Sequence, residues 1–262
     1  MYSKYKKIAE TAALAGVIML ESHAESYRVE DTVRRMLATS GLDITEVVST
    51  TTALYITLDD SNPEVESITL VRRISSRGNH LRKIYRVNNI SRALTANEIT
   101  IEEANQQLKV VDQMEYTPQQ KMIATNILVV AFAILLGGNI GEVIVSIFAG
   151  AIVSYSTAIK QFFGMNDFIY GMFTTALVAL IFPIVIYFIP YQISSDIIII
   201  SGLMPLYPGT AFTNGVRDTL KGDYNSGLAR IADALVIALS LALGVVLGLS
   251  ISGGVISLLS NI

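Results

Sequence analysis

A long apolar segment, FIYGMFTTALVALIFPIVIYFI at residues 168–189, dominates the second half of the 262-residue chain. It contains no charged side chain. A helix of about 20 mostly apolar residues is long enough to cross the roughly 30 Å hydrocarbon core of a bilayer. The segment therefore predicts a transmembrane helix.

Four further apolar windows lie around it, at residues 122–138, 140–159, 194–213 and 228–252. Little more than Gly137–Asn139 separates the first two windows, which fits a tight hairpin. We therefore expect residues 122–262 to form an all-α polytopic membrane domain of about five transmembrane helices. In the last window, Gly244, Gly248 and Ser252 are spaced four apart, which predicts a face where helices pack closely.

Charged residues are concentrated before this region. The chain has 19 basic and 22 acidic residues, of which only 4 basic and 6 acidic ones follow Lys121. Hydrophobic residues make up 52% of the whole chain, and its mean hydropathy is +0.51. The first 121 residues are thus the water-soluble part, and we expect them to form an α+β cytoplasmic domain.

Composition also excludes several classes of protein. The apolar content excludes a disordered chain, and the lack of cysteine excludes a disulfide-stapled fold and a thiol nucleophile. With two histidines and no cysteine we expect no metal site, and a net charge of −3 argues against nucleic-acid binding. The sequence has no GxxxxGK[ST] phosphate loop, and we expect no cofactor.

Within residues 1–121, apolar side chains recur at helical spacing from Ile8 to Met19 and from Val29 to Leu37, which predicts two helices before Gly41. Stretches rich in β-branched and aromatic residues predict strands at 45–58, 67–74 and 81–87. Two helices, one around Ser91 and one over 101–115, are expected to close the domain before Pro118.

The few cations of the second half predict its orientation, because Lys and Arg in short loops stay on the cytoplasmic side. Lys160 lies between the second and third predicted spans, and Arg217, Lys221 and Arg230 lie between the fourth and fifth. We therefore expect a multi-pass protein of the cytoplasmic (inner) membrane, with the N-terminus in the cytoplasm and the C-terminus outside.

The first 24 residues offer an alternative, since lysines precede an apolar run at 8–20 as in a signal peptide. Glu10 interrupts that run, and export of the domain would place all four loop cations outside. We therefore favour an amphipathic cytoplasmic helix over a signal peptide.

Three polar groupings are candidates for function. The first lies where one predicted helix ends and the next begins, and forms either a capped helix junction or a gate at the cytoplasmic mouth of a transport path. Its members are Glu21, Ser22, Glu25, Arg28 and Glu30.

The second grouping surrounds two prolines three residues apart. Proline disfavours regular helix, and a broken helix at membrane depth is tolerated where it lines a cavity, although a simple proline kink is the alternative. We therefore expect a substrate path at Pro205, Pro208, Gly209, Thr210, Asn214, Arg217, Asp218 and Asp223.

The third grouping consists of acids near predicted span ends. A carboxylate within a span commonly faces a cavity, a partner or a proton path. Glu142 and Asp196 are the candidate coupling acids, and contact with lipid headgroups is the alternative for both.

Several motifs together resemble the threonine/serine exporter (ThrE) family, and the resemblance covers nearly the whole chain. They are AESYRVEDT at 24–32, VNNISR at 87–92, EEA at 102–104, PLYPG at 205–209 and GDYNSGLAR at 222–230. His23 stands where the family pattern has glycine. The chain resembles the larger, amino-terminal subunit of split members, and related split systems are implicated in succinate export.

This resemblance implies a secondary exporter of a small polar metabolite, either threonine or serine or a small dicarboxylate such as succinate, driven by the proton gradient or the membrane potential. It implies a small multi-span partner subunit in the bilayer, and we expect an oligomeric assembly without nucleic acid. The alternatives are a membrane-anchored cytoplasmic enzyme with a hydrolytic domain and a scaffold without transport. Five spans with a double-proline break exceed what an anchor needs, so we expect a transporter, not an enzyme.

Overall fold

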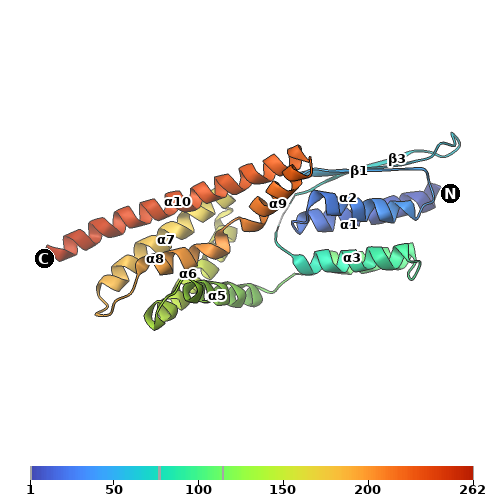
Figure 1. Ribbon diagram of the computed structural model, residues 1–262. Helices are drawn as coiled ribbons and strands as arrows, with labels where there is room; N and C mark the ends of the chain where they lie inside the picture. The colour runs from blue at the N-terminus through green and yellow to red at the C-terminus, as the bar shows by residue number, and fades with distance from the viewer. Residues whose placement is uncertain (1, 76–77, 114, 262) are drawn as a thin grey trace. The chain divides into compact units, whose positions relative to one another are not determined.

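The computed structural model describes residues 2–75, 78–113 and 115–261. It is mostly helical, with one small three-stranded sheet (Figure 1). Two compact units are present: the first comprises Met1–Glu115 with Gly209–Ala232, and the second comprises Tyr116–Pro208 with Asp233–Ile262. The sequence predicts two domains divided once, after residue 121. In the structure, residues 209–232 also belong to the first unit, so the chain enters that unit twice.

Among its described residues, the first unit contains seven elements before residue 115 and two after residue 208. They are α1 (Tyr2–Glu21), α2 (Ser26–Ala38), β1 (Ile44–Ser49), β2 (Ala53–Asp59), β3 (Ile68–Arg73), α3 (Leu81–Thr95), α4 (Ile101–Asp112), α9 (Gly209–Leu220) and the first turns of α10 (Tyr224–Ser260).

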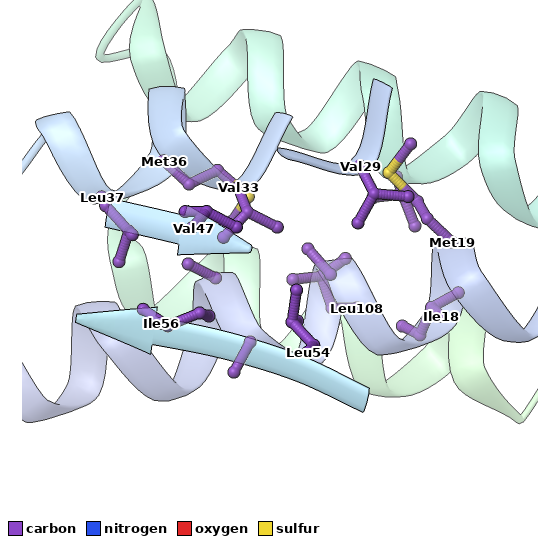
Figure 2. Packing of buried hydrophobic residues seen from close by; sticks show 14 of the residues in the cluster. Ile18, Met19, Val29, Val33, Met36, Leu37, Val47, Leu54, Ile56 and Leu108 are labelled. Atoms are coloured by element: carbon purple, nitrogen blue, oxygen red, sulfur yellow. The ribbon is translucent and has the colours of Figure 1, made fainter. Parts of the chain in front are cut away.

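The core of this unit lies between its sheet and its helices. The sheet is antiparallel in the order β1-β2-β3, and Leu54, Ile56 and Leu58 of β2 are buried while Tyr55 between them is exposed. This period of two is that of a strand with one buried face. Figure 2 shows Leu54 and Ile56 packed with apolar side chains of α1, α2 and α4.

Helix α1 lies in the middle of the unit, in contact with α2, α3, α4, β2 and β3. Its apolar run from Ile8 to Leu20 is buried on more than one face, which is more than the amphipathic helix we expected. The feature that mimics a signal peptide in the sequence is therefore a central core helix in the structure.

Two strand predictions were wrong in detail. The stretch 45–58 is a hairpin of two strands, because Thr50 turns the chain by accepting the backbone N–H of Ala53 at 3.0 Å. Residues 81–87 form the start of α3, since Ile84, Val87 and Leu94 are buried at helical spacing and His80 caps the helix by accepting the Lys83 N–H. The predicted helices at 8–19, 29–37, around 91 and from 101 are confirmed.

The regular structure described in the second unit is helical. It contains α5 (Pro118–Leu135), α6 (Ile140–Phe163), α7 (Asp167–Tyr187), α8 (Ser195–Leu203), the short 3-10 helix η1 (Met204–Leu206) and the remainder of α10. By length and composition, four described helices can cross a membrane: α5, α6, α7 and α10.

The predicted fourth span, 194–213, is not one continuous helix. Helix α8 and η1 end at Leu206, Tyr207 is extended with φ −67° and ψ 129°, and α9 begins at Gly209. Pro205 and Pro208 explain the interruption, because each lacks the N–H that a continuing helix would use.

Close helix packing stabilises the second unit. Val129, Ala149, Val178 and Ile198 form the centre of its apolar core. Between α7 and α10, the Thr175 hydroxyl donates to the Leu241 carbonyl at 3.1 Å. A Cβ added at Gly244 would lie 2.0 Å from Thr175 Oγ1, and one added at Gly248 would lie 2.5 Å from the Ala176 oxygen. The predicted small-residue face is thus a contact within the chain.

Candidate functional site

The first unit brings together two of the predicted groupings, the α1–α2 junction and helix α9. Glu25 lies at the junction, and its side chain is only 8% exposed. Its Oε2 accepts from Arg28 Nη1 at 3.1 Å, and its Oε1 pairs with Arg217 of α9. Glu25 is therefore neutralised by two guanidinium groups, and its partner Arg217 is 192 residues away in the chain.

The backbone of the junction is set by the way α1 ends. His23 has φ +64°, its N–H donates to the Leu20 carbonyl, and the Ala24 N–H donates to the Met19 carbonyl at 3.0 Å. This is the Schellman arrangement, whose left-handed residue is usually glycine. Side chains of α9 and α10 donate hydrogen bonds to two carbonyls of the junction. Asn214 donates to the His23 oxygen at 2.8 Å, and Arg230 donates to the Ala24 oxygen at 2.9 Å.

Replacing His23 by glycine is expected to raise the free energy of unfolding by about 0.5–1 kcal/mol. A side chain with a Cβ is strained at positive φ, and glycine removes that strain at the cost of a more flexible unfolded chain. Guanidinium unfolding of the full chain in detergent, followed by circular dichroism, measures the change.

Asn97 gives the matched control for this substitution. It has φ +59° at the end of α3, and asparagine tolerates this conformation better than histidine does. Asn97→Gly should therefore gain less than His23→Gly. A loss of stability in His23→Gly would show that the histidine side chain matters more than its backbone strain.

A buried ion pair lies beneath the junction. Asp218 Oδ2 is 3.3 Å from Arg230 Nε and accepts from the Ser26 hydroxyl at 3.3 Å, and the Asp218 and Arg230 side chains are 1% and 9% exposed. Burial raises the pKa of Asp218 above its ordinary value, and the charge of Arg230 opposes that rise. A buried pair adds little net stability, but removing one partner leaves the other charge buried and unpaired.

Two more predicted residues have structural partners. Glu30 Oε1 accepts the Ser49 N–H at 2.8 Å, which ties α2 to β1. Asp223 accepts the Ser226 N–H at 3.2 Å and so caps the start of α10. Both residues therefore stabilise the frame around the junction.

Beside the junction lies a cavity of about 370 Å³, lined by the first unit alone. The α1–α2 junction contributes Ser22, His23, Glu25 and Arg28. Helix α9 contributes Thr210 and Asn214.

The remaining wall of the cavity is α3 and the segment before it. Tyr85, Asn88 and Arg92 face the cavity from successive turns of α3, and Asn79 precedes the helix. Asn88 and Arg92 belong to the VNNISR motif at 87–92, which supports the family resemblance but was not predicted to form a site. Residues at i, i+3 and i+7 share one face of a helix. Because 81–87 was predicted to be a strand, this shared face was not recognised from the sequence.

Other predicted site residues lie elsewhere. Glu21 is at the end of α1, where burial first and Asp112 second raise the pKa of its carboxyl. Pro205 and Pro208 belong to the second unit, and Gly209 is the first residue of α9.

The two candidate coupling acids differ in environment. Glu142 is buried at the start of α6, accepts the Asn139 N–H in a capping box and accepts the Ser194 N–H at 2.7 Å. Asp196 is exposed in the first turn of α8. Glu142 therefore joins the α7–α8 connection to the start of α6, whereas the Asp196 carboxylate is accessible.

Sequence comparison with known proteins covers nearly the whole chain. The family model described as "Putative threonine/serine exporter" (ThrE) matches residues 10–252. The chain is 22% identical over 251 residues to the "Probable succinate transporter subunit YjjP" of Klebsiella aerogenes, covering 96% of each protein. It is 21% identical over 238 residues to the protein of the same name from Escherichia coli K12, covering 91% of this chain and 92% of that protein. No solved structure matches the chain.

Proposed function

Because the chain belongs to the threonine/serine exporter (ThrE) family, it is a transport protein, and we propose that it carries a small polar metabolite out of the cytoplasm as the larger subunit of a split secondary exporter. The family match over residues 10–252 is the observation that carries this proposal. The comparisons give no support to a membrane-anchored hydrolytic enzyme. The cargo is threonine, serine or a small dicarboxylate, and the names of the two relatives favour succinate.

The proposed topology combines the four long helices with the distribution of cations. If the Lys160 loop and Arg217 both lie in the cytoplasm, the chain must recross the membrane between α7 and α9. The 12 residues of α8 and η1 with the extended Tyr207–Pro208 step span about 25 Å at standard rises. We assign them as a short, interrupted fifth crossing, with the first unit in the cytoplasm and the C-terminus outside the inner membrane.

The proposed path runs along this interrupted crossing. Pro205 and Pro208 interrupt the helix, and Thr210 and Asn214, which follow in α9, line the cavity of the first unit. Helix breaks at membrane depth are where many transporters bind substrate. Because Glu142 is committed to capping, Asp196 is the better candidate for coupling export to the proton gradient.

Efflux of labelled threonine, serine and succinate from cells tests the proposal. Cells producing the chain together with its small multi-span partner should export at least one of the three faster than cells producing either subunit alone. Asp196→Asn is expected to reduce that export by about tenfold or more, because it removes the proposed proton-carrying group.

Asp167→Asn is the matched control, since Asp167 is also an exposed acid in the first turn of an apolar helix. It should leave export unchanged within about twofold. Equal efflux of all three metabolites with and without the subunits would exclude the proposed cargo. Full export by Asp196→Asn would exclude Asp196 as the coupling acid.

A further inference from the structure

The polar groups left available in the first unit's cavity are mainly hydrogen-bond donors. The side-chain oxygen of Asn88 already accepts from the Thr32 hydroxyl at 3.2 Å, and that of Asn79 accepts from the Thr210 hydroxyl at 2.8 Å. Each amide therefore has its NH₂ group left for a ligand. Asn214 differs from these two, since its NH₂ is used by the His23 carbonyl and its oxygen remains an acceptor.

The charge of the cavity points in the same direction. Its lining contains two guanidinium groups, Arg28 and Arg92, and one carboxylate, Glu25. Glu25 is already paired with Arg28 and with Arg217, so the negative charge in the wall is more than compensated. A cavity with surplus positive charge and available N–H donors suits an anion whose atoms accept hydrogen bonds.

The shape of the cavity limits the size of that anion. Its volume of about 370 Å³ falls within the roughly 300–1,000 Å³ typical of small-molecule sites. Ala24, Leu81 and Ile84 give it an apolar part beside the donors. A short carbon chain can therefore lie against these side chains while its charged group faces the arginines.

We propose that this cavity binds a small carboxylate metabolite, with the carboxylate held by Arg28, Arg92 and the NH₂ group of Asn88. The site lies outside every described helix that can span a membrane, so it receives ligand from the aqueous phase. The proposal rests on the proposed function only in the choice of metabolites to test. Binding would place a loading or sensing step in the first unit, before any crossing of the bilayer.

Calorimetric titration of the purified full chain in detergent with succinate, L-threonine and 1,4-butanediol tests this proposal. Saturable binding is expected for at least one of the two carboxylates and not for 1,4-butanediol, which has the succinate chain length without charge. Asn88→Asp is expected to weaken carboxylate binding by at least about tenfold, because an acceptor and a negative charge replace the donor. The Thr32 hydroxyl can still donate to the new carboxylate, which preserves the packing of α3 on α2.

Gln107→Glu and Arg34→Gln are the matched controls. Gln107 is exposed on α4 and lies outside the cavity lining, so its replacement adds one negative charge elsewhere in the unit. Arg34 is exposed on α2, the helix of Arg28. Both variants should bind as the parent does, whereas Arg28→Gln should bind at least about tenfold more weakly.

The outcomes separate this site from the transport function. The proposal would be overturned if neither carboxylate bound saturably, or if carboxylate binding were unchanged in Asn88→Asp. Neither outcome would bear on export, which the efflux experiment measures separately. Binding lost in Asn88→Asp and kept in Gln107→Glu would support the site even if no efflux were detected.

Discussion

Replacing Arg230 by methionine is expected to lower the free energy of unfolding of the full chain by about 3–5 kcal/mol at neutral pH. Methionine fills a similar length with an apolar side chain but leaves the buried Asp218 carboxylate without the guanidinium beside it. It also removes the hydrogen bond that Arg230 donates to the Ala24 carbonyl. Guanidinium unfolding in detergent, followed by circular dichroism, measures the loss.

The pH dependence of this loss identifies its cause. Burial already raises the pKa of Asp218, and removing Arg230 removes the charge that lowers it, so the pKa of Asp218 rises further in the variant. Both folded proteins keep this proton above the ordinary value of 3.8, and the parent gives it up at a lower pH than the variant. The difference in stability therefore grows as the pH rises above the raised pKa of Asp218 in the parent. At lower pH Asp218 is protonated in both proteins and the difference between them should shrink.

Arg34→Met is the control, because Arg34 is exposed on α2 and its replacement should change stability by less than about 0.5 kcal/mol. A loss below about 1 kcal/mol in Arg230→Met, or a loss that does not change with pH, would show that the pair with Asp218 does not hold α10 to the α1–α2 junction.

Replacing Gly244 by leucine is expected to separate α7 from α10 and to abolish export. A Cβ at this position would lie 2.0 Å from Thr175 Oγ1 and 2.3 Å from the Met172 oxygen, and the second of these is backbone that cannot move aside alone. Overpacking of this kind costs about 1–3 kcal/mol, and more where backbone must shift. Leucine is a good helix former, so the effect would be steric.

Gly253→Leu in the same helix is the matched control, because nothing lies within 4 Å of a Cβ built there. Thermal unfolding followed by circular dichroism should show a marked fall in the midpoint for Gly244→Leu and none for Gly253→Leu. Equal midpoints in the two variants would mean that the close approach of α7 and α10 is not needed for the folded state.

The sequence predicts those helices and strands that are marked by the spacing of their own apolar residues. The period of 3.6 between Val29 and Leu37 marks α2, and the alternation around Leu54 and Ile56 marks β2. Residues 81–87 were predicted wrongly because their β-branched and aromatic side chains favour a strand locally, whereas packing on α1 and α4 selects a helix. The interruption at Pro205 and Pro208 was predictable from chemistry, but the length of helix on either side was not.

The candidate site was predictable as separate groups of residues and not as one site. Glu25 and Arg217 each attract attention as charged residues in the sequence, yet nothing in the sequence pairs them across 192 positions. Asp218 was predicted to line a path, and the structure places it in a buried pair with Arg230. Asn88 could be identified only once α3 was known to be a helix, because its position relative to the cavity follows from the helical period.

Transport by the reconstituted subunits tests the central claim most directly. Purified chain and the proposed small membrane partner are inserted together into liposomes loaded with unlabelled succinate, threonine or serine, and uptake of the same labelled metabolite by exchange is measured. We predict accumulation of at least one metabolite well above that of empty liposomes and of liposomes holding Gly244→Leu with the partner. Uptake of all three metabolites at the level of empty liposomes would contradict the assignment of this chain as a subunit of a small-metabolite exporter.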